Sequence, residues 1–139
     1  MPEQPDWQPI SRLSLIGSMI DGMLQDAEEN HQTLLQASPK PHVLDDYTVG
    51  RVFAVFGRQK DDLWLFEEQL ARWKMDKLSV GQRDEVDRLT EQLGRCRTVI
   101  DSILSLAERL KQGTIEKVLG KSDLELGLEF LLGKGNPHH

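Results

Sequence analysis

A chain of 139 residues with 29% charged and 38% hydrophobic residues suits amphipathic helices with solvated outer faces better than a buried sheet. Its formal net charge of −6 disfavours nucleic acid and anionic membranes as partners, because both would require a concentrated basic face. A single cysteine, Cys96, excludes an intramolecular disulfide and favours a reducing compartment, so we expect a cytoplasmic location. The sequence shows no leader pattern that would argue for secretion. It also contains no apolar run of about 20 residues that would argue for membrane insertion.

Three prolines, Pro2, Pro5 and Pro9, predict an extended N-terminal arm over residues 1–10. We expect Trp7 to anchor this arm to the remainder of the chain. A single helical-bundle domain is predicted over residues 11–133, and residues 134–139 read as a frayed tail.

The first predicted helix covers residues 11–36, where apolar residues recur at alternating spacings of three and four. Gly17 and Gly22 lower its intrinsic helix propensity by about 1 kcal/mol each, so packing must compensate. Because glycine permits a close approach of helices, both positions are candidates for a helix crossing. The sequence Ser38-Pro39-Lys40-Pro41 then ends the helix.

Two longer helices follow, over residues 46–75 and 79–113. Asp45 or Asp46 can cap the first of them, and Ser79 with Gln82 has the spacing of a capping box. The short connection between the two predicts an antiparallel helical hairpin. We therefore expect an all-α fold: a three-helix up-down-up bundle built on this hairpin, with one or two short C-terminal helices. The apolar stripes of the hairpin are Val49, Val52, Phe56, Gln59, Leu63, Phe66, Leu70 and Trp73, and Val86, Leu89, Leu93, Cys96, Ile100, Ile103, Ala107 and Leu110.

The second helix has a wide apolar face, because Phe53, Val55 and Leu65 lie beside its main stripe. Such a face implies contact with more than one neighbour, either the first helix or another subunit. Near the C-terminus a short helix is predicted over residues 122–132, and it is too short to be stable alone. It must dock on the hairpin, on a second copy of the chain or on a foreign partner. Its candidate interface residues are Leu124, Leu128, Phe130, Leu131 and Leu132.

Three polar or weakly polar residues, Asn30, Gln59 and Cys96, interrupt the apolar stripes. A polar side chain in a helix seam commonly fixes register or oligomeric state at some cost in stability, and this is the role expected of these residues. Cys96 also suits a small buried hydrophobe better than a reactive thiol, since no histidine pattern near it argues for activation.

A shift of 37 residues superimposes the pattern of the second helix on that of the third, including Gly57-Arg58 on Gly94-Arg95. Two helices with heptad patterns align whenever their stripes are in phase, so a true duplication and a coincidence both stay open. The arginines of these helices could form a basic stripe, but acidic residues one turn upstream of several would cancel its potential. We expect no nucleic-acid partner.

Glu28 and His31 have the one suggestive metal-binding spacing, since a carboxylate and an imidazole three residues apart share a helix face. Di-iron carboxylate bundles need a second such pair and further inward glutamates, which this sequence does not offer. The sequence contains no phosphate-binding loop, catalytic triad or zinc-ligand pattern. We expect a non-enzymatic helical protein-protein interaction module without cofactor, forming a homodimer through the second helix and the C-terminal segment. The alternative is a metal-binding protein or metal-dependent enzyme centred on Glu28 and His31.

Overall fold

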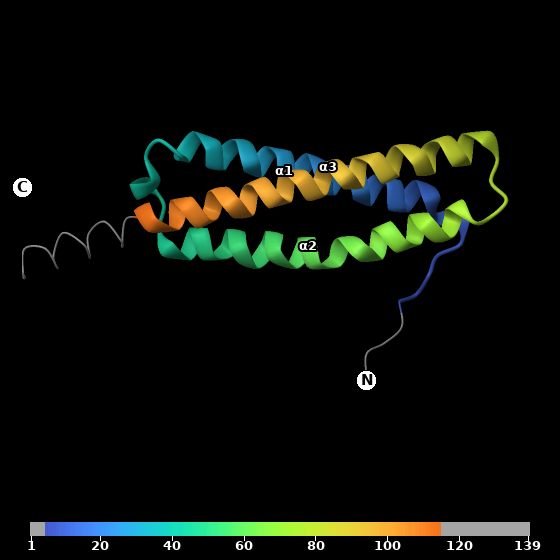
Figure 1. The fold of residues 1–139 in the computed structure, drawn as a ribbon, viewed down its shortest axis with the longest axis horizontal. Helices are drawn as coiled ribbons and strands as arrows, with labels where there is room; N and C mark the ends of the chain where they lie inside the picture. Colours follow the sequence, from blue (N-terminus) through green and yellow to red (C-terminus); the bar gives the residue numbers. More distant parts are fainter. Residues whose placement is uncertain (1–4, 115–139) are drawn as a thin grey trace, which may run out of the picture.

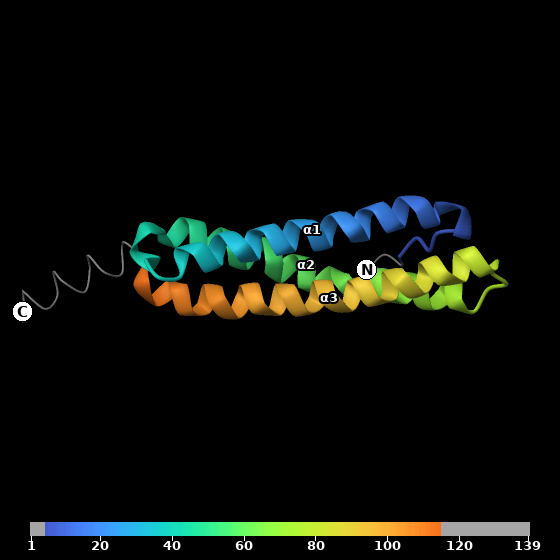
Figure 2. The same ribbon diagram turned by 90° about the horizontal axis from the view of Figure 1, so that it is seen from above.

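The computed structural model describes residues 5–114, and all regular structure within that range is helical (Figure 1). Three long helices, α1 (Leu13–Ala37), α2 (Asp46–Lys74) and α3 (Val80–Leu110), lie side by side along their lengths (Figures 1 and 2). Short 3₁₀ turns stand before, between and after them at Ile10–Arg12, Pro41–Val43 and Lys111–Gly113. The predicted all-α fold is confirmed, whereas the short C-terminal helices expected before Gly133 lie outside the described residues.

The helices begin where the capping residues predict. The Asp45 carboxylate accepts a hydrogen bond from the Thr48 amide at 2.7 Å at the start of α2. Hydrogen bonding from the Thr48 side chain, and after it the bond from the Thr48 amide, lowers the pKa of the Asp45 carboxyl. Ser79 and Gln82 form the predicted capping box, with bonds of 3.1 and 3.0 Å that satisfy two backbone donors of α3.

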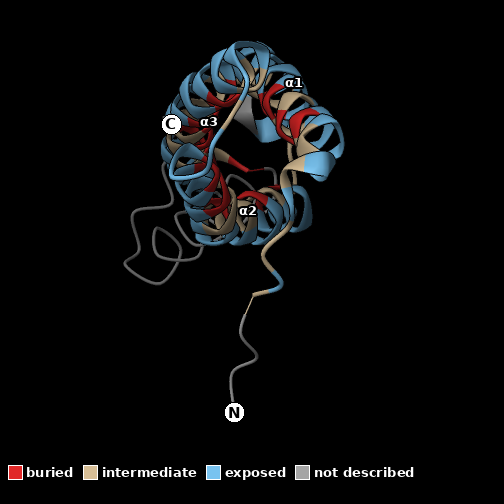
Figure 3. Cartoon of the chain, turned by 90° about the vertical axis from the view of Figure 1, so that its right-hand side faces the viewer, coloured by how far each residue is buried: buried red, intermediate tan, exposed pale blue. Residues whose placement is uncertain are grey.

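The core follows α3, because α1 and α2 each pack closely along it and approach each other much less closely. Every residue of the predicted α3 stripe is buried, and Figure 3 shows the buried residues facing inward between the helices. Gly17 supports this packing, since a Cβ built on it would lie 3.4 Å from the Leu89 side chain. Gly22 has no neighbour within 4 Å of such an atom, so only one of the two glycines marks a helix contact.

The stripes of α1 and α2 divide into two series of residues seven positions apart. One series on each helix is buried against α3: Ile20, Ala27 and Leu34 on α1, and Val49, Phe56, Leu63 and Leu70 on α2. The other series is half-buried over most of its length: Ile16, Met23 and Asn30 on α1, and Val52, Gln59 and Phe66 on α2. Trp73, the last member on α2, is buried. Residues seven apart share a helix face, so the half-buried series turn toward the space between α1 and α2. We call this the open side of the bundle.

The two ends of the open side differ. At one end the N-terminal arm, residues 5–9, passes between α1 and α2 before the first 3₁₀ turn (Figure 3). At the other end the Thr114 hydroxyl donates to the Asp46 carboxylate at 2.6 Å, and Thr114 is fully buried. This bond holds the residue that follows the last 3₁₀ turn at the start of α2.

Candidate protein-interaction site

The N-terminal arm is held on α2 by main-chain and side-chain hydrogen bonds. The Gln8 amide donates to Gln69 Oε1 at 2.6 Å, and Gln69 Nε2 donates back to the Gln8 carbonyl at 3.2 Å. The same carbonyl accepts a bond from Trp73 Nε1 at 2.9 Å. Gln69 and Trp73 are both buried, so these polar groups satisfy each other away from water.

Trp7 anchors the arm from the outer face of α2, as predicted. Its ring meets Trp64 edge to face, with ring centroids 6.4 Å apart. The guanidinium carbon of Arg72 lies 4.4 Å from the centroid of the Trp7 ring, a cation–π geometry. Arg72 also pairs with Glu68 at 3.3 Å. Trp64 keeps 52% of its surface exposed, so the cluster faces solvent.

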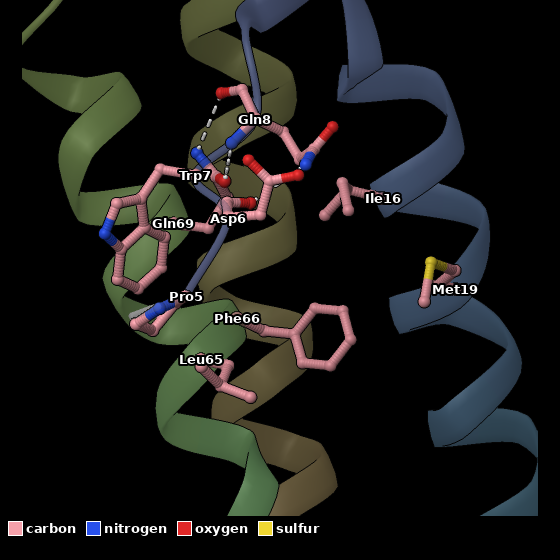
Figure 4. A pocket seen from close by; sticks show the side chains of 9 residues that line it. All are labelled: Pro5, Asp6, Trp7, Gln8, Ile16, Met19, Leu65, Phe66 and Gln69. Atoms are coloured by element: carbon pink, nitrogen blue, oxygen red, sulfur yellow. Dashed lines mark hydrogen bonds between the residues drawn. The ribbon is translucent and has the colours of Figure 1, made fainter. Parts of the chain in front are cut away.

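An apolar hollow of about 260 Å³ lies between the arm, α1 and α2 (Figure 4). Ile16 and Met19 face it from α1, and Leu65 and Phe66 face it from α2 (Figure 4). Met19 is 46% exposed, so the hollow is not sealed. The complete lining is Pro5, Asp6, Trp7, Gln8, Ile16, Met19, Leu65, Phe66 and Gln69.

The predicted interface residues of α2 do not share one face. Leu65 lines the hollow, Val55 is 41% exposed, and Phe53 is half-buried. Residues two positions apart on an α-helix are separated by about 200° around the helix axis, so Phe53 and Val55 lie on nearly opposite sides of α2. Leu124, Leu128, Phe130, Leu131 and Leu132 lie outside the described residues.

The polar residues of the stripes have three different environments. Asn30 is half-buried, and its amide donates to the Asp26 carbonyl at 2.8 Å within its own helix. Gln59 is half-buried, and its Oε1 is buried without a hydrogen-bond donor among the described residues. Cys96 is fully buried, and burial raises the pKa of its thiol. The predicted register-setting roles stay predictions.

Among the described residues, the fold does not bring Glu28 and His31 into a group of metal-binding side chains. Glu28 is exposed, and its carboxylate lies 3.5 Å from Arg95. His31 lines a shallow surface hollow with Leu35 and Asp101. Within residues 5–114, no three His, Cys, Asp or Glu side chains gather in a group that could hold a metal ion.

The arginines on α3 pair with carboxylates across helices. Arg88 donates to Asp21 on α1 at 2.9 and 3.1 Å and also bonds Glu85. The bonds to Glu85 and Asp21 raise the pKa of Arg88, and in return the bond from Arg88 lowers the pKa of the Asp21 carboxyl. Arg97 pairs with Glu67 on α2. Arg88 therefore pairs both across helices and with an upstream residue of its own helix, as Arg72 does with Glu68.

Sequence reasoning missed Gln8, Gln69 and Trp64 as parts of this site. Gln69 lies off the apolar stripe, and its partner Gln8 is 61 residues away in the chain. Periodicity describes one helix at a time, so it carries no signal for that contact.

Comparison with known proteins finds no family model, curated protein or solved structure that matches this chain. Among residues 5–114, no helix is both long and apolar enough to cross a membrane.

Proposed function

We propose that this chain is a non-enzymatic helical interaction module that pairs with a second copy of itself through the surface around its N-terminal arm. The observation that carries the proposal is the exposed Trp64, whose ring meets Trp7 edge to face. Trp7 in turn contacts Arg72 and lines the apolar hollow. Tryptophan and arginine are the residues most enriched in the energetic centres of protein interfaces.

Further exposed apolar side chains extend this surface. Met19 is 46% exposed and Leu15 is 53% exposed, one helical turn apart on α1. Leu65 contributes from α2. Covering these side chains removes apolar surface from water, at about 25 cal/mol for each Å². The hollow and its exposed rim would accept an apolar side chain from the second copy.

The proposal includes an up-down-up course for the three helices. The ion pairs support this course. Lys60 pairs with Asp101 at 2.7 Å, and Lys74 pairs with Asp87 at 3.9 Å. Residue numbers therefore rise along α2 where they fall along α3, as in two antiparallel helices. Asp21 and Glu28 pair with Arg88 and Arg95, so the numbers rise together on α1 and α3. We also propose a cytoplasmic location, because the lone buried Cys96 suits a reducing compartment.

The test is the mass of the full chain in solution, measured by light scattering and sedimentation over a concentration series. We expect a dimer, and we expect Trp64→Glu to weaken it at least tenfold by placing a charge at the centre of the interface. The matched control is Val43→Glu, which alters a side chain that is 62% exposed at the other end of the bundle.

The control should dimerise as the parent chain does. A chain that stays monomeric at every concentration contradicts self-association. A dimer that survives Trp64→Glu but dissociates with Val43→Glu contradicts the position of the interface. Circular dichroism of each variant establishes that the helices are retained.

A further inference from the structure

The open side of the bundle is covered at one end only. The arm lies over Ile16, Met19, Leu65 and Phe66. Met23 and Val52 continue the same faces at seven- and fourteen-residue spacings, and both are only half-buried against the core. Val55, eleven residues before Phe66 and therefore on its face, is 41% exposed. Met23, Val52 and Val55 therefore keep part of their surface uncovered by residues 5–114.

The second half of the open side also contains a polar group that needs a partner. Gln59 lies seven residues before Phe66, and its Oε1 is buried without a donor among the described residues. A buried acceptor left unpaired costs about 1–3 kcal/mol.

The described part of the chain ends near the end of the open side that the arm does not cover. Thr114, the last described residue, is bonded to Asp46 at the start of α2, which is the end of the open side that the arm does not cover. At about 1.5 Å per residue, the helix predicted over residues 122–132 would span about 17 Å, and residues 115–121 are available to connect it to Thr114. The part of α2 that the arm does not cover runs from Asp46 to Leu65. At the same rise per residue it is about 28 Å long.

The chemistry of that segment matches the open side. Leu124, Leu128 and Leu131 form one helical stripe, and acidic residues flank it at Asp123, Glu125 and Glu129. On α2, Arg51 and Arg58 lie four residues before and three residues after Val55, so they flank the same side of the helix. Both arginines are exposed, and neither forms an ion pair within residues 5–114.

We propose that the helix predicted over residues 122–132 docks on the open side of its own chain as a fourth helix, with the leucine stripe over Met23, Val52 and Val55. The acidic flank then faces Arg51 and Arg58. An intramolecular segment has an effective concentration in the millimolar range, which favours it over the same segment of a second copy. This proposal does not rest on self-association through the arm surface, and the two can fail independently.

The test is thiol accessibility in the full chain. Val55→Cys places a reporter on the covered face, while Cys96 is fully buried with a raised thiol pKa, so it contributes little background. Leu35→Cys is the matched control: Leu35 is 42% exposed, as Val55 is, but lies beside α3 in the shallow hollow with Leu106. We expect the Val55→Cys thiol to react with a maleimide at least tenfold more slowly than the Leu35→Cys thiol.

Adding Leu128→Asp should remove that difference, because a carboxylate in the leucine stripe opposes docking. Arg58→Glu, a substitution at an exposed position that leaves the core intact, should raise the rate of Val55→Cys by a smaller factor. Equal rates for Val55→Cys and Leu35→Cys without these changes would overturn the proposal. Protection of Val55→Cys that disappears on dilution would overturn it as well, because the covering segment would then belong to a second copy.

Discussion

Two regions of this bundle start from the same apolar periodicity and reach different degrees of burial. Along α3, every stripe residue from Val86 to Leu110 is buried, because a helix packs on each side of it. Along the open side, the stripe residues of α1 and α2 that do not face α3 stay half-buried, except Trp73, which is buried and bonds Gln8 of the arm. The comparison shows that a 3-4 pattern specifies which face of a helix is apolar, while the number of neighbours decides how much of that face is covered.

Two phenylalanines on α2 allow the packing on the α3 side and on the open side to be compared directly. Phe56 faces α3 and is 3% exposed, whereas Phe66 faces the open side and is half-buried. We expect Phe56→Ala to lower the free energy of unfolding by about 3–5 kcal/mol. Phe66→Ala should cost clearly less, because fewer contacts are lost. Urea denaturation of both variants measures this, and equal losses would mean that the two sides of α2 are packed alike.

A second variant tests how the arm closes its half of the open side. Gln69→Ala removes both side-chain bonds to Gln8, and one buried main-chain group loses its partner. We expect a loss of about 1–3 kcal/mol in denaturation. Limited proteolysis should also cut residues 5–9 faster. Gln25→Ala, which breaks only an exposed bond of 3.2 Å to Glu29, is the control and should stay within about 0.5 kcal/mol of the parent.

Gly17 lies on the face of α1 that contacts α3, whereas Gly22 lies on a face exposed to solvent. The same substitution at both positions therefore compares these two environments. Gly22→Ala should stabilise the protein by about 1 kcal/mol, because alanine has the higher helix propensity and nothing lies within 4 Å of the new methyl group. Gly17→Ala should gain less, since its methyl would meet Leu89 at 3.4 Å. Thermal unfolding of both variants ranks them, and a larger gain at Gly17 would contradict the close contact of α1 with α3.

The smallest effect expected is the pH dependence of the Asp21–Arg88 pair between α1 and α3. Because the bond from Arg88 lowers the pKa of Asp21 below 3.8 in the folded state, its stabilisation is present above that pKa and is lost as the pH falls through the folded value. The Asp21 side chain is 42% exposed, so solvent screening limits the pair to about 0.2–1 kcal/mol.

Asp21→Asn should therefore be slightly less stable than the parent at pH 7 and should approach it as the pH falls through the lowered pKa of Asp21. Denaturation series at pH 7 and through that acidic range give the difference. A gap that stays constant with pH would assign the effect of the substitution to something other than this ion pair.

Local chemistry in the sequence was sufficient to find the helices. The prolines at 39 and 41 end one helix, Asp45 caps the next, and the Ser79–Gln82 capping box starts the third. These signals act over three or four residues, so a single sequence displays them directly. The stripe of α3 was likewise correct at each position.

The site depended on contacts that no local pattern encodes. Trp7 could be named as an anchor from its place in a proline-rich arm, but its partners Trp64 and Arg72 could not, because they lie more than fifty residues away in the chain. The wide face of α2 was read as one surface, yet Phe53 and Val55 lie on nearly opposite sides of the helix.

For this protein, the sequence alone determined the all-α class, the helix boundaries and the apolar stripe of each helix, because backbone capping and 3.6-residue periodicity are local properties. Only the tertiary structure decided that α3 is the central helix, that α1 and α2 leave an open side between them, and that Gln8, Gln69 and Trp73 secure the arm there. Those features depend on how helices distribute themselves around one another, and that is a matter of contacts between residues distant in the chain.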